Sequence, residues 1–425
     1  MLVNVNPEIF RQYDIRGVVG KDLTPDIANL IGRAFGTYLY SKFKIQNSKF
    51  KISVGRDVRL HSEQLADALI NGIISIFGDA IQDIRRIIDA EDFKKGDGKK
   101  TSINTIPDYV DRLKKEFSPL INSKADIKVV VDAGNGTAGI IAPKLFEYLG
   151  CNIIKLFCEP DGRFPNHHPD PTVVENLKTL IDTVKSQNAD AGIAFDGDAD
   201  RLGVVDGNGN VIWGDILLLA FAKDIIERQK SKGKRQKEGK PTFVGEVKCS
   251  QVMYDEIEKM GGNAIMGKTG HSLIKQLMKE KGALLAGEMS GHMFFRDRYY
   301  GYDDAIYASL RLIELLSKDR DYIKNLISNM PKTFYTPEIR VDCPDNIKFK
   351  IIDGLGNVFQ RDKDLLGIKD IITVDGLRVH FKDGWGLVRA SNTQPVLVMR
   401  FEASSQDSLK KIQRIVEGKL KEEMI

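Results

Sequence analysis

Three carboxylates alternate along one short stretch of the chain, at Asp196, Asp198 and Asp200. The apolar runs at 191–195 and 202–205 predict buried strands on either side, so the carboxylates are expected on a tight loop between two strands. Like charges this close repel one another unless a cation holds them. A cluster made only of oxygens suits a hard ion, and the spacing therefore predicts a Mg2+ site.

Two other interpretations of this loop were weighed. An EF-hand loop would need Gly at its sixth position and Glu at its twelfth, where this chain has Arg201 and Gly207, so that interpretation fails. A solvated acidic turn is the alternative that stays open.

A second polar segment near the end of the chain has the chemistry of a phosphate site. Arg389, Ser391, Asn392 and Thr393 offer a guanidinium, two hydroxyls, an amide and loop N–H groups. Such groups bind a phosphate dianion through charge-assisted hydrogen bonds. Taken alone, the segment also fits a capped loop.

A third segment has the chemistry of a sugar site. Glu288 and Ser290 stand between glycines, which lets the backbone approach a ligand closely, and they can bond to sugar hydroxyls. His292 or His271 could exchange a proton with a hydroxyl near neutral pH. A polar turn and a satisfied core histidine are the structural alternatives.

The elements that must position these segments follow an alternating pattern. A strand at 128–131, a Gly-rich turn at 132–139, a helix at 140–148, a strand at 152–157 and a helix around 173–186 precede the carboxylate loop. Alternating strands and helices predict a largely parallel sheet. The Gly-rich turn lacks both GxGxxG and the P-loop lysine, so we interpret it as a structural turn rather than a phosphate cradle.

Composition limits the class of protein. A length of 425 residues suits about three domains. The net charge of +4 is too small to argue for nucleic acid or an anionic membrane, and the basic stretch 229–241 is expected to be a solvated loop between domains. The four cysteines form no CxxC pair. No signal peptide or membrane span is indicated, and a cytoplasmic location is expected.

The combination of motifs resembles one family. The segments YDIRG at 13–17, VGRDVR at 54–59, DGDADR at 196–201, GEMSGH at 287–292 and RASNT at 389–393 occur in the order seen in the α-D-phosphohexomutases. The resemblance is strongest to the bacterial phosphomannomutase/phosphoglucomutase branch and covers nearly the whole chain.

The resemblance implies an α/β fold with four domains around a deep cleft. Three domains are related α/β units, the first cut short here, and the last is an α+β domain that binds phosphate. The expected bounds are 1–120 for domain I, 121–228 for domain II with the metal loop, 241–332 for domain III with the sugar loop, and 336–425 for domain IV.

The same resemblance implies roles for individual residues. Asp196, Asp198 and Asp200 would hold Mg2+, with Arg201 beside the transferring phosphate. Glu288 and Ser290 would hold the sugar hydroxyls O3 and O4. The non-reacting phosphate would be clamped by Arg389, Ser391, Asn392 and Thr393. The cleft would also be lined by Tyr13, Arg16, Lys248, His271, Met289, Gly291 and His292. Either His292 or Arg16 would transfer a proton.

The reaction implied is intramolecular phosphotransfer between C1 and C6 of glucose or mannose phosphate. A phosphoserine of domain I gives its phosphoryl group to the hexose phosphate, and the bisphosphate turns over in the cleft and returns the other phosphate. Mg2+ and hexose 1,6-bisphosphate are the expected cofactor and activator. The expected partner is a hexose phosphate, and we expect a monomer or weak dimer.

One family motif is missing. The nucleophile of the family lies in a Thr-Ala-Ser-His-Asn-Pro loop, followed by an Asn-Gly-x-Lys stretch, and neither occurs in this chain. The chain passes almost directly from 69–75 to 79–87, and neither Ser62 nor Ser75 has the neighbours of that nucleophile. Two explanations compete: an internally deleted copy of an ordinary mutase, which we favour, or a paralogue that binds hexose phosphate or regulates without catalysis.

Overall fold

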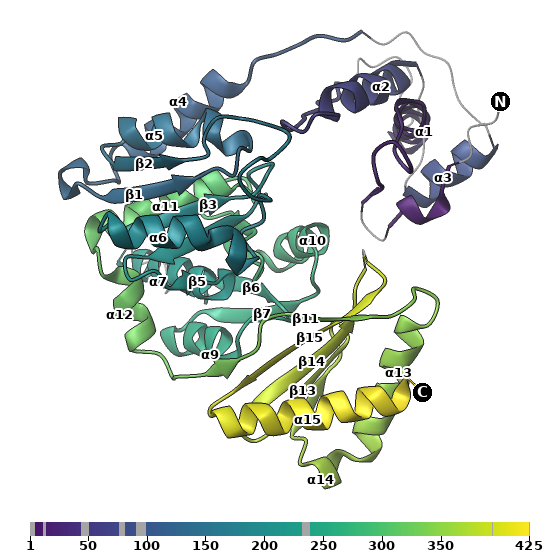
Figure 1. Cartoon of the computed structure of the whole chain (residues 1–425), viewed down its shortest axis with the longest axis vertical. Coiled ribbons are helices and arrows are strands. Elements are labelled where there is room, and N and C mark those ends of the chain that lie inside the picture. The colour runs from purple at the N-terminus through teal and green to yellow at the C-terminus, as the bar shows by residue number, and fades with distance from the viewer. Residues whose placement is uncertain are drawn as a thin grey trace.

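The structure is a computed structural model, and it describes residues 5–11, 14–43, 51–75, 81–90, 99–231, 239–392 and 394–424. Figure 1 shows four regions in chain order around the molecule: a helical one at the N-terminal end, two sheets with helices, and a C-terminal sheet backed by helices. The junction at 76–80, the residues Tyr13 and Thr393, and most of the basic stretch fall outside the described residues.

The first region consists of helices in the part of it that is described. These are α1 (Pro25–Phe43), α2 (Ser62–Ser75) and α3 (Ile81–Ala90). Helices α1 and α2 cross at glycines: a Cβ on Gly32 would lie 2.1 Å from the carbonyl oxygen of Leu69, so a larger residue would separate the helices. Residues 5–11, 14–43, 51–75, 81–90 and 99–105 contain isolated bridges but no strand.

The second region is a five-stranded sheet of order β2-β1-β3-β4-β5. Its helices are α4 (Ile106–Phe117), α5 (Ala142–Tyr148) and α6 (Lys178–Ser186); its strands are β1 (Lys128–Asp132), β2 (Asn152–Leu156), β3 (Ala191–Phe195), β4 (Leu202–Asp206) and β5 (Val211–Ile212). Strand β1 is parallel to β2 and β3, whereas β3 and β4 are antiparallel. The expectation of a largely parallel sheet is therefore correct for three strands and wrong for two, because the carboxylate loop is a hairpin.

The third region repeats this arrangement. Its sheet has the order β7-β6-β8-β9, with β8 and β9 antiparallel. Its strands are β6 (Thr242–Glu246), β7 (Asn263–Gly267), β8 (Leu285–Gly287) and β9 (Met293–Phe295); its helices are α7 (Gly214–Ser231), α9 (Gln251–Met260), α10 (His271–Lys281), α11 (Ala305–Lys318) and α12 (Tyr322–Ser328). The order second-first-third-fourth is the same for the first four strands of both sheets, so the two regions share one α/β topology.

The C-terminal region is an antiparallel sheet with helices, as expected for an α+β domain. Its strands are β10 (Phe334–Tyr335), β11 (Ile339–Asp342), β12 (Asp370–Ile372), β13 (Leu377–His380), β14 (Gly384–Ala390) and β15 (Val396–Ala403); its helices are α13 (Lys348–Arg361), α14 (Lys363–Leu366) and α15 (Gln406–Glu423). A separate hydrophobic core, centred on side chains such as Leu355, Phe359 and Val416, lies between α13, α15 and the sheet.

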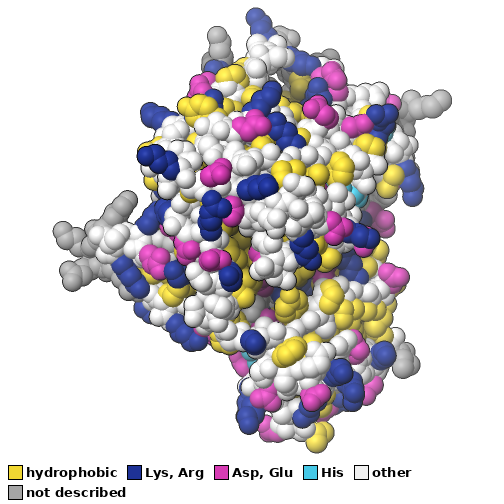
Figure 2. Space-filling model, turned by 60° about the vertical axis from the view of Figure 1, so that its left-hand side comes forward, with side chains coloured by type: hydrophobic (Ala, Val, Ile, Leu, Met, Phe, Trp, Pro, Cys, Tyr) yellow, Lys and Arg dark blue, Asp and Glu magenta, His cyan; other side chains and the backbone are white. Residues whose placement is uncertain are grey.

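The distribution of charged side chains on the surface agrees with the small net charge of the chain. On the face drawn in Figure 2, basic and acidic side chains are interspersed rather than gathered by sign. None of the helices in the described ranges has the length and apolar character needed to cross a bilayer.

Candidate active site

The three carboxylates lie on the hairpin between β3 and β4. Asp196 is fully buried, and its Oδ1 accepts hydrogen bonds from the backbone N–H groups of Asp200 (2.9 Å) and Arg201 (3.0 Å). Asp196, Asp198 and Asp200 each place one oxygen so that the three lie within 4.8 Å of one another. The loop thus forms an acidic cluster with the geometry of a metal site.

The electrostatics of this cluster favour a cation. Burial, together with the charge of Asp200, raises the pKa of Asp196 to about 6. The pKa of Asp198 is also raised, by its desolvating surroundings and by the charge of Asp196. Because ionised carboxylates are costly in this loop, a divalent ion that bound there would relieve the repulsion.

The Gly-rich turn supports the metal loop from behind. Thr137 donates its backbone N–H (3.1 Å) and its Oγ1 hydroxyl (3.2 Å) to the carbonyl oxygen of Gly197. A Cβ on Gly136 would lie 2.8 Å from the same oxygen, so a side chain there would push the loop away. These contacts support the interpretation of a structural turn.

Arg201 joins the metal loop to its neighbours. Its Nε donates to Asp196 (2.7 Å) and its Nη1 to Asp170 (3.2 Å). Arg201 also forms an antiparallel β-bridge with His292. The metal loop and the sugar loop therefore lie side by side.

Two histidines meet a carboxylate beside the metal loop. His292 Nδ1 lies 3.3 Å from Asp303 and 3.6 Å from Asp200. Burial alone would lower the pKa of His292, but the close carboxylate of Asp303 and the charges of Glu288 and Asp200 raise it to about 9. The ring of His271 stacks on that of His292 at a centroid distance of 6.2 Å. Burial and the charge of Lys275 lower the pKa of His271.

The sugar loop is held by backbone groups around it. Glu288 is buried, its Oε1 accepts from the N–H of Gly270 (3.2 Å), and its Oε2 accepts from the hydroxyl of Ser290 (3.3 Å). The N–H of Met289 donates to Glu246 (3.3 Å), and the N–H of Gly291 donates to the carbonyl of Glu288 (3.0 Å). The loop therefore presents its residues in a fixed conformation.

Lys248 follows β6 and is buried between carboxylates. Its Nζ lies 3.1 Å from Glu338 and 3.8 Å from Glu246. Glu338 lies between β10 and β11 of the C-terminal region. The ammonium of Lys248 is thus held where the third and C-terminal regions meet.

The phosphate segment begins where β14 ends. Arg389 is buried and donates from Nε to Asp375 (2.9 Å). Ser391 accepts on Oγ from the N–H of Gln394 (3.2 Å), which fixes a turn around Asn392. Thr393, the remaining member of the expected clamp, lies outside the described residues.

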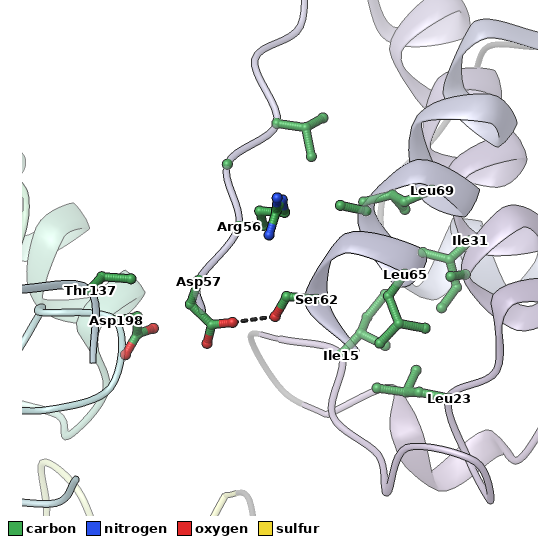
Figure 3. Close-up of a pocket in the computed structure, with 14 residues that line it drawn as sticks. Ile15, Leu23, Ile31, Arg56, Asp57, Ser62, Leu65, Leu69, Thr137 and Asp198 are labelled. Atoms are coloured by element: carbon green, nitrogen blue, oxygen red, sulfur yellow. Dashed lines mark hydrogen bonds between the residues drawn. The ribbon is translucent and has the colours of Figure 1, made fainter. Parts of the chain in front are cut away.

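The first region approaches the metal loop at a cavity of about 670 Å³ (Figure 3). Leu65 and Leu69 of α2 form part of its apolar wall, and Asp57, Ser62 and Asp198 lie on the polar side. The Ser62 hydroxyl donates to Asp57. The helices beside this cavity pack against one another in a small hydrophobic cluster that includes Ile27 and Ile31 of α1 and Ile87 of α3.

Other residues of the first region are only partly placed. Arg16, expected in the cleft, donates from Nε to Asp14 (2.5 Å) and its side chain is 58% exposed. The charge of Asp14 acts weakly on the pKa of His271, against the larger effects of burial and Lys275. Tyr13 lies outside the described residues.

Sequence reasoning missed several charged residues of the site, namely Arg59, Asp170, Glu246, Asp303 and Asp375. Arg59 stands inside the VGRDVR motif, and its Nη2 would lie 3.5 Å from a Cβ on Gly197. Glu246 directly precedes Val247-Lys248, at the carboxyl end of a strand, where ligand sites of α/β sheets lie. The other three stand in loops with no spacing signal.

The fold and the site together define a four-region protein in which the metal loop, the sugar loop and the phosphate segment lie on three successive regions. Family models match each region: "Phosphoglucomutase/phosphomannomutase, alpha/beta/alpha domain I" at 7–83, domain II at 107–209, domain III at 213–334 and the C-terminal domain at 338–419. The chain belongs to the phosphoglucomutase/phosphomannomutase family, and so to the phosphohexomutases, which are isomerases.

Individual relatives agree over nearly the full length. The chain is 41% identical over 464 residues to a phosphomannomutase/phosphoglucomutase of Pseudomonas aeruginosa, covering 97% of this chain and 95% of the relative. It is 38% identical to a phosphoglucomutase of Neisseria meningitidis, covering 97% of this chain and 96% of the relative. A crystal structure of a family protein from Burkholderia thailandensis superposes with a TM-score of 0.87 at 35% identity, covering 99% of this chain and 98% of that one.

Proposed function

We propose that this chain binds Mg2+ and a hexose phosphate in the cleft, and that its family reaction is phosphotransfer between C1 and C6 of glucose or mannose. The observation that carries the proposal is the β-bridge between Arg201 and His292, which holds the metal loop against the sugar loop. Phosphoryl transfer needs charge neutralisation and positioning more than covalent help from the protein. A cation site beside a sugar site suits that chemistry.

The proposed roles are those that the family resemblance implies, and the geometry of the carboxylate cluster supports the first of them. Asp196, Asp198 and Asp200 hold Mg2+, because three oxygens without nitrogen or sulfur suit a hard cation. Arg201 neutralises the transferring phosphate. The ligand sugar lies against the loop of Glu288 and Ser290, with Met289, Gly291, His271 and Lys248 around it. Its far phosphate is clamped by Arg389, Ser391, Asn392 and Thr393. Tyr13 and Arg16 line the cleft from the first region, and proton transfer falls to His292 or Arg16.

Turnover by this chain is proposed to be impaired. The printed sequence contains no Thr-Ala-Ser-His-Asn-Pro segment. The alignment with the Pseudomonas relative spans 464 positions for a chain of 425 residues, so that relative has residues without a counterpart here. A covalent route needs an activated nucleophile, and water in its place would give slow hydrolysis rather than isomerisation.

The test is a mutase assay on two proteins. Conversion of glucose 1-phosphate to glucose 6-phosphate is measured with Mg2+ and a trace of the 1,6-bisphosphate, for the chain as it stands and for one with a family-type serine segment restored after Ser75. We expect negligible turnover by the first and rates on the order of 10 per second by the second. Ordinary rates from the unrestored chain would refute the impairment.

The second candidate function is a hexose-phosphate-binding or regulatory paralogue. This second function is favoured if the protein with the restored serine segment stays inactive while both it and the unaltered chain bind glucose 1-phosphate. The proposal also includes a cytoplasmic location, a monomer or weak dimer, and hexose 1,6-bisphosphate as activator. It keeps the expected domain bounds, except that α4 (Ile106–Phe117) goes with the second region and α7 (Gly214–Ser231) with the third.

A further inference from the structure

Asp375 links two regions of the site through one carboxylate oxygen. It lies in the turn between β12 and β13, and its Oδ2 accepts from the backbone N–H of Thr269 (3.0 Å) and from Nε of Arg389 (2.9 Å). Its side chain is only 12% exposed. Thr269 belongs to the third region and Arg389 to the C-terminal region, so Asp375 joins the two where the ligand would lie.

The backbone beside Asp375 is built for this close approach. Gly376 has a φ of +79°, and a Cβ there would lie 2.4 Å from the carbonyl oxygen of Val388 and 2.6 Å from Cα of Arg389. A side chain at this position would therefore lift the turn away from β14. The contact between Asp375 and Arg389 depends on that glycine.

On its other side, Thr269 connects to a carboxylate that gathers the loops of the third region. The Thr269 hydroxyl donates to Oε2 of Glu246 (2.8 Å). Glu246 is fully buried at the end of β6, and it also accepts from the N–H groups of Lys248 (2.9 Å) and Met289 (3.3 Å). A continuous chain of hydrogen bonds thus runs from the sugar loop through Glu246, Thr269 and Asp375 to Arg389.

The surrounding interface uses the same kind of contact. Arg378 of β13 is fully buried and donates from Nη1 to the carbonyl oxygens of Val247 (2.7 Å) and Cys249 (2.8 Å). Arg400 of β15 donates to Asp215 (3.3 Å). The C-terminal region is therefore docked onto the loops of the third region by buried charged side chains rather than by apolar packing alone.

We propose that Asp375 is a positioning residue that docks the Arg389 phosphate clamp onto the sugar-binding loops, so that phosphate and sugar hydroxyls of one hexose phosphate are recognised at a fixed spacing. This inference rests on the proposed function of the site. A carboxylate beside Arg389 weakens the attraction of that guanidinium for a phosphate dianion. A role in fixing the position of Arg389 would explain why Asp375 stands in a phosphate site. Without that role, the Asp375 carboxylate would only lower the affinity for phosphate.

The test compares two ligands in calorimetric titrations. Glucose 1-phosphate needs both the clamp and the sugar loops, whereas inorganic phosphate needs only the clamp. Asp375→Ala should bind glucose 1-phosphate roughly five- to tenfold more weakly, a usual size for coupling between sites, and inorganic phosphate as well as or better than the unaltered chain. Thr269→Val should weaken glucose 1-phosphate in the same direction, and Asp375→Asn should recover part of the loss. Asp370→Ala, on the exposed edge of β12, is the matched control and should change neither affinity.

A second measurement does not depend on any ligand. In the unliganded protein, Asp375→Ala removes the acceptor of the Thr269 N–H, so residue-resolved hydrogen exchange at that amide should become faster while Asp370→Ala leaves it unchanged. Equal losses for both ligands in Asp375→Ala would mean that Asp375 only orients Arg389, and would overturn the proposal. If the unaltered chain fails to bind glucose 1-phosphate, the proposed function is wrong. The positioning role of Asp375 is then tested by hydrogen exchange alone, and unchanged exchange of the Thr269 amide in Asp375→Ala would overturn it.

Discussion

Arg201 and His292 are paired by an antiparallel β-bridge, although they lie 91 positions apart in the sequence. Beside the bridge, the N–H of Leu202 donates to the carbonyl of Gly291 at 3.1 Å. The metal loop of one α/β unit is thereby joined to the sugar loop of the next through backbone, which ordinary side-chain substitutions do not remove. The distance between the metal loop and the sugar loop is consequently fixed by the backbone of the two α/β units.

This join predicts a strong effect of Gly291→Ala. Gly291 has a φ of +97°, and a Cβ would lie 2.4 Å from the carbonyl oxygen of Leu202. We expect a loss of unfolding free energy of about 3 kcal/mol, from backbone strain and the clash together. Gly282→Ala is the control, because Gly282 has a φ of +63° with nothing near its missing Cβ. It should cost only about 1 kcal/mol. If urea unfolding gave the same loss of unfolding free energy for both variants, the bridge would be shown to adapt to the added Cβ without further cost.

Asp198→Asn should weaken Mg2+ binding by roughly tenfold or more, because it removes one of three anionic oxygens from a small cluster. Calorimetric titration with MgCl2 measures the change. Mg2+ at a hundredfold excess over its dissociation constant should also stabilise the unaltered chain by about 2.7 kcal/mol, and the variant much less. Asp182→Asn, exposed on α6 of the same region, is the control. Identical isotherms for all three proteins would remove the metal assignment.

Arg389→Ala should weaken binding of glucose 1-phosphate by about tenfold or more, because a charge-assisted contact to phosphate contributes about 1.5–3 kcal/mol. Arg389→Lys keeps the charge but loses the planar fork, so it should recover only part of the affinity. Arg361→Ala, an exposed arginine on α13 of the same region, tests for a loss of general positive charge. An unchanged dissociation constant in Arg389→Ala would exclude this clamp.

Much of the middle of the fold could be predicted because its strands are short apolar runs. The residues 191–195 were expected as a strand and form β3, and the carboxylate loop follows directly. The helix expected at 140–148 begins later, as α5 at Ala142, after a 3-10 turn at Thr137–Ile140. The turn carries the backbone that supports the metal loop, a requirement that no periodicity reveals.

The contacts between regions could not be predicted in the same way. Asp303 and Asp375 stand in polar turns that look like any solvated loop, and their partners are His292, in a β-bridge, and Arg389, near the end of β14. Only folding brings these segments together. The resemblance supplied the residues that would touch a ligand, but it was silent on the carboxylates that hold those residues in place.

His167 offers a test by pH of the support behind the metal loop. Its Nε2 lies 3.2 Å from both oxygens of Asp132, and its Nδ1 lies 3.0 Å from the carbonyl of His168. With acceptors at both nitrogens the charged ring is favoured, and the hydrogen bond to Asp132 raises the pKa of His167 above its ordinary value of 6.5 despite burial. The pair therefore stabilises the fold fully below pH 6.5, and this contribution is lost as the pH rises through the higher folded-state pKa.

We expect His167→Gln to lower the free energy of unfolding more at pH 5.5 than at pH 9, since only the charged ring is favoured by folding. Urea unfolding at both pH values measures the difference. His168→Gln is the control, because the neighbouring side chain is exposed. A cost of His167→Gln that stays the same at both pH values would mean that the ring contributes by packing on Phe157, whose ring it meets edge-on at 5.4 Å, and not by its charge.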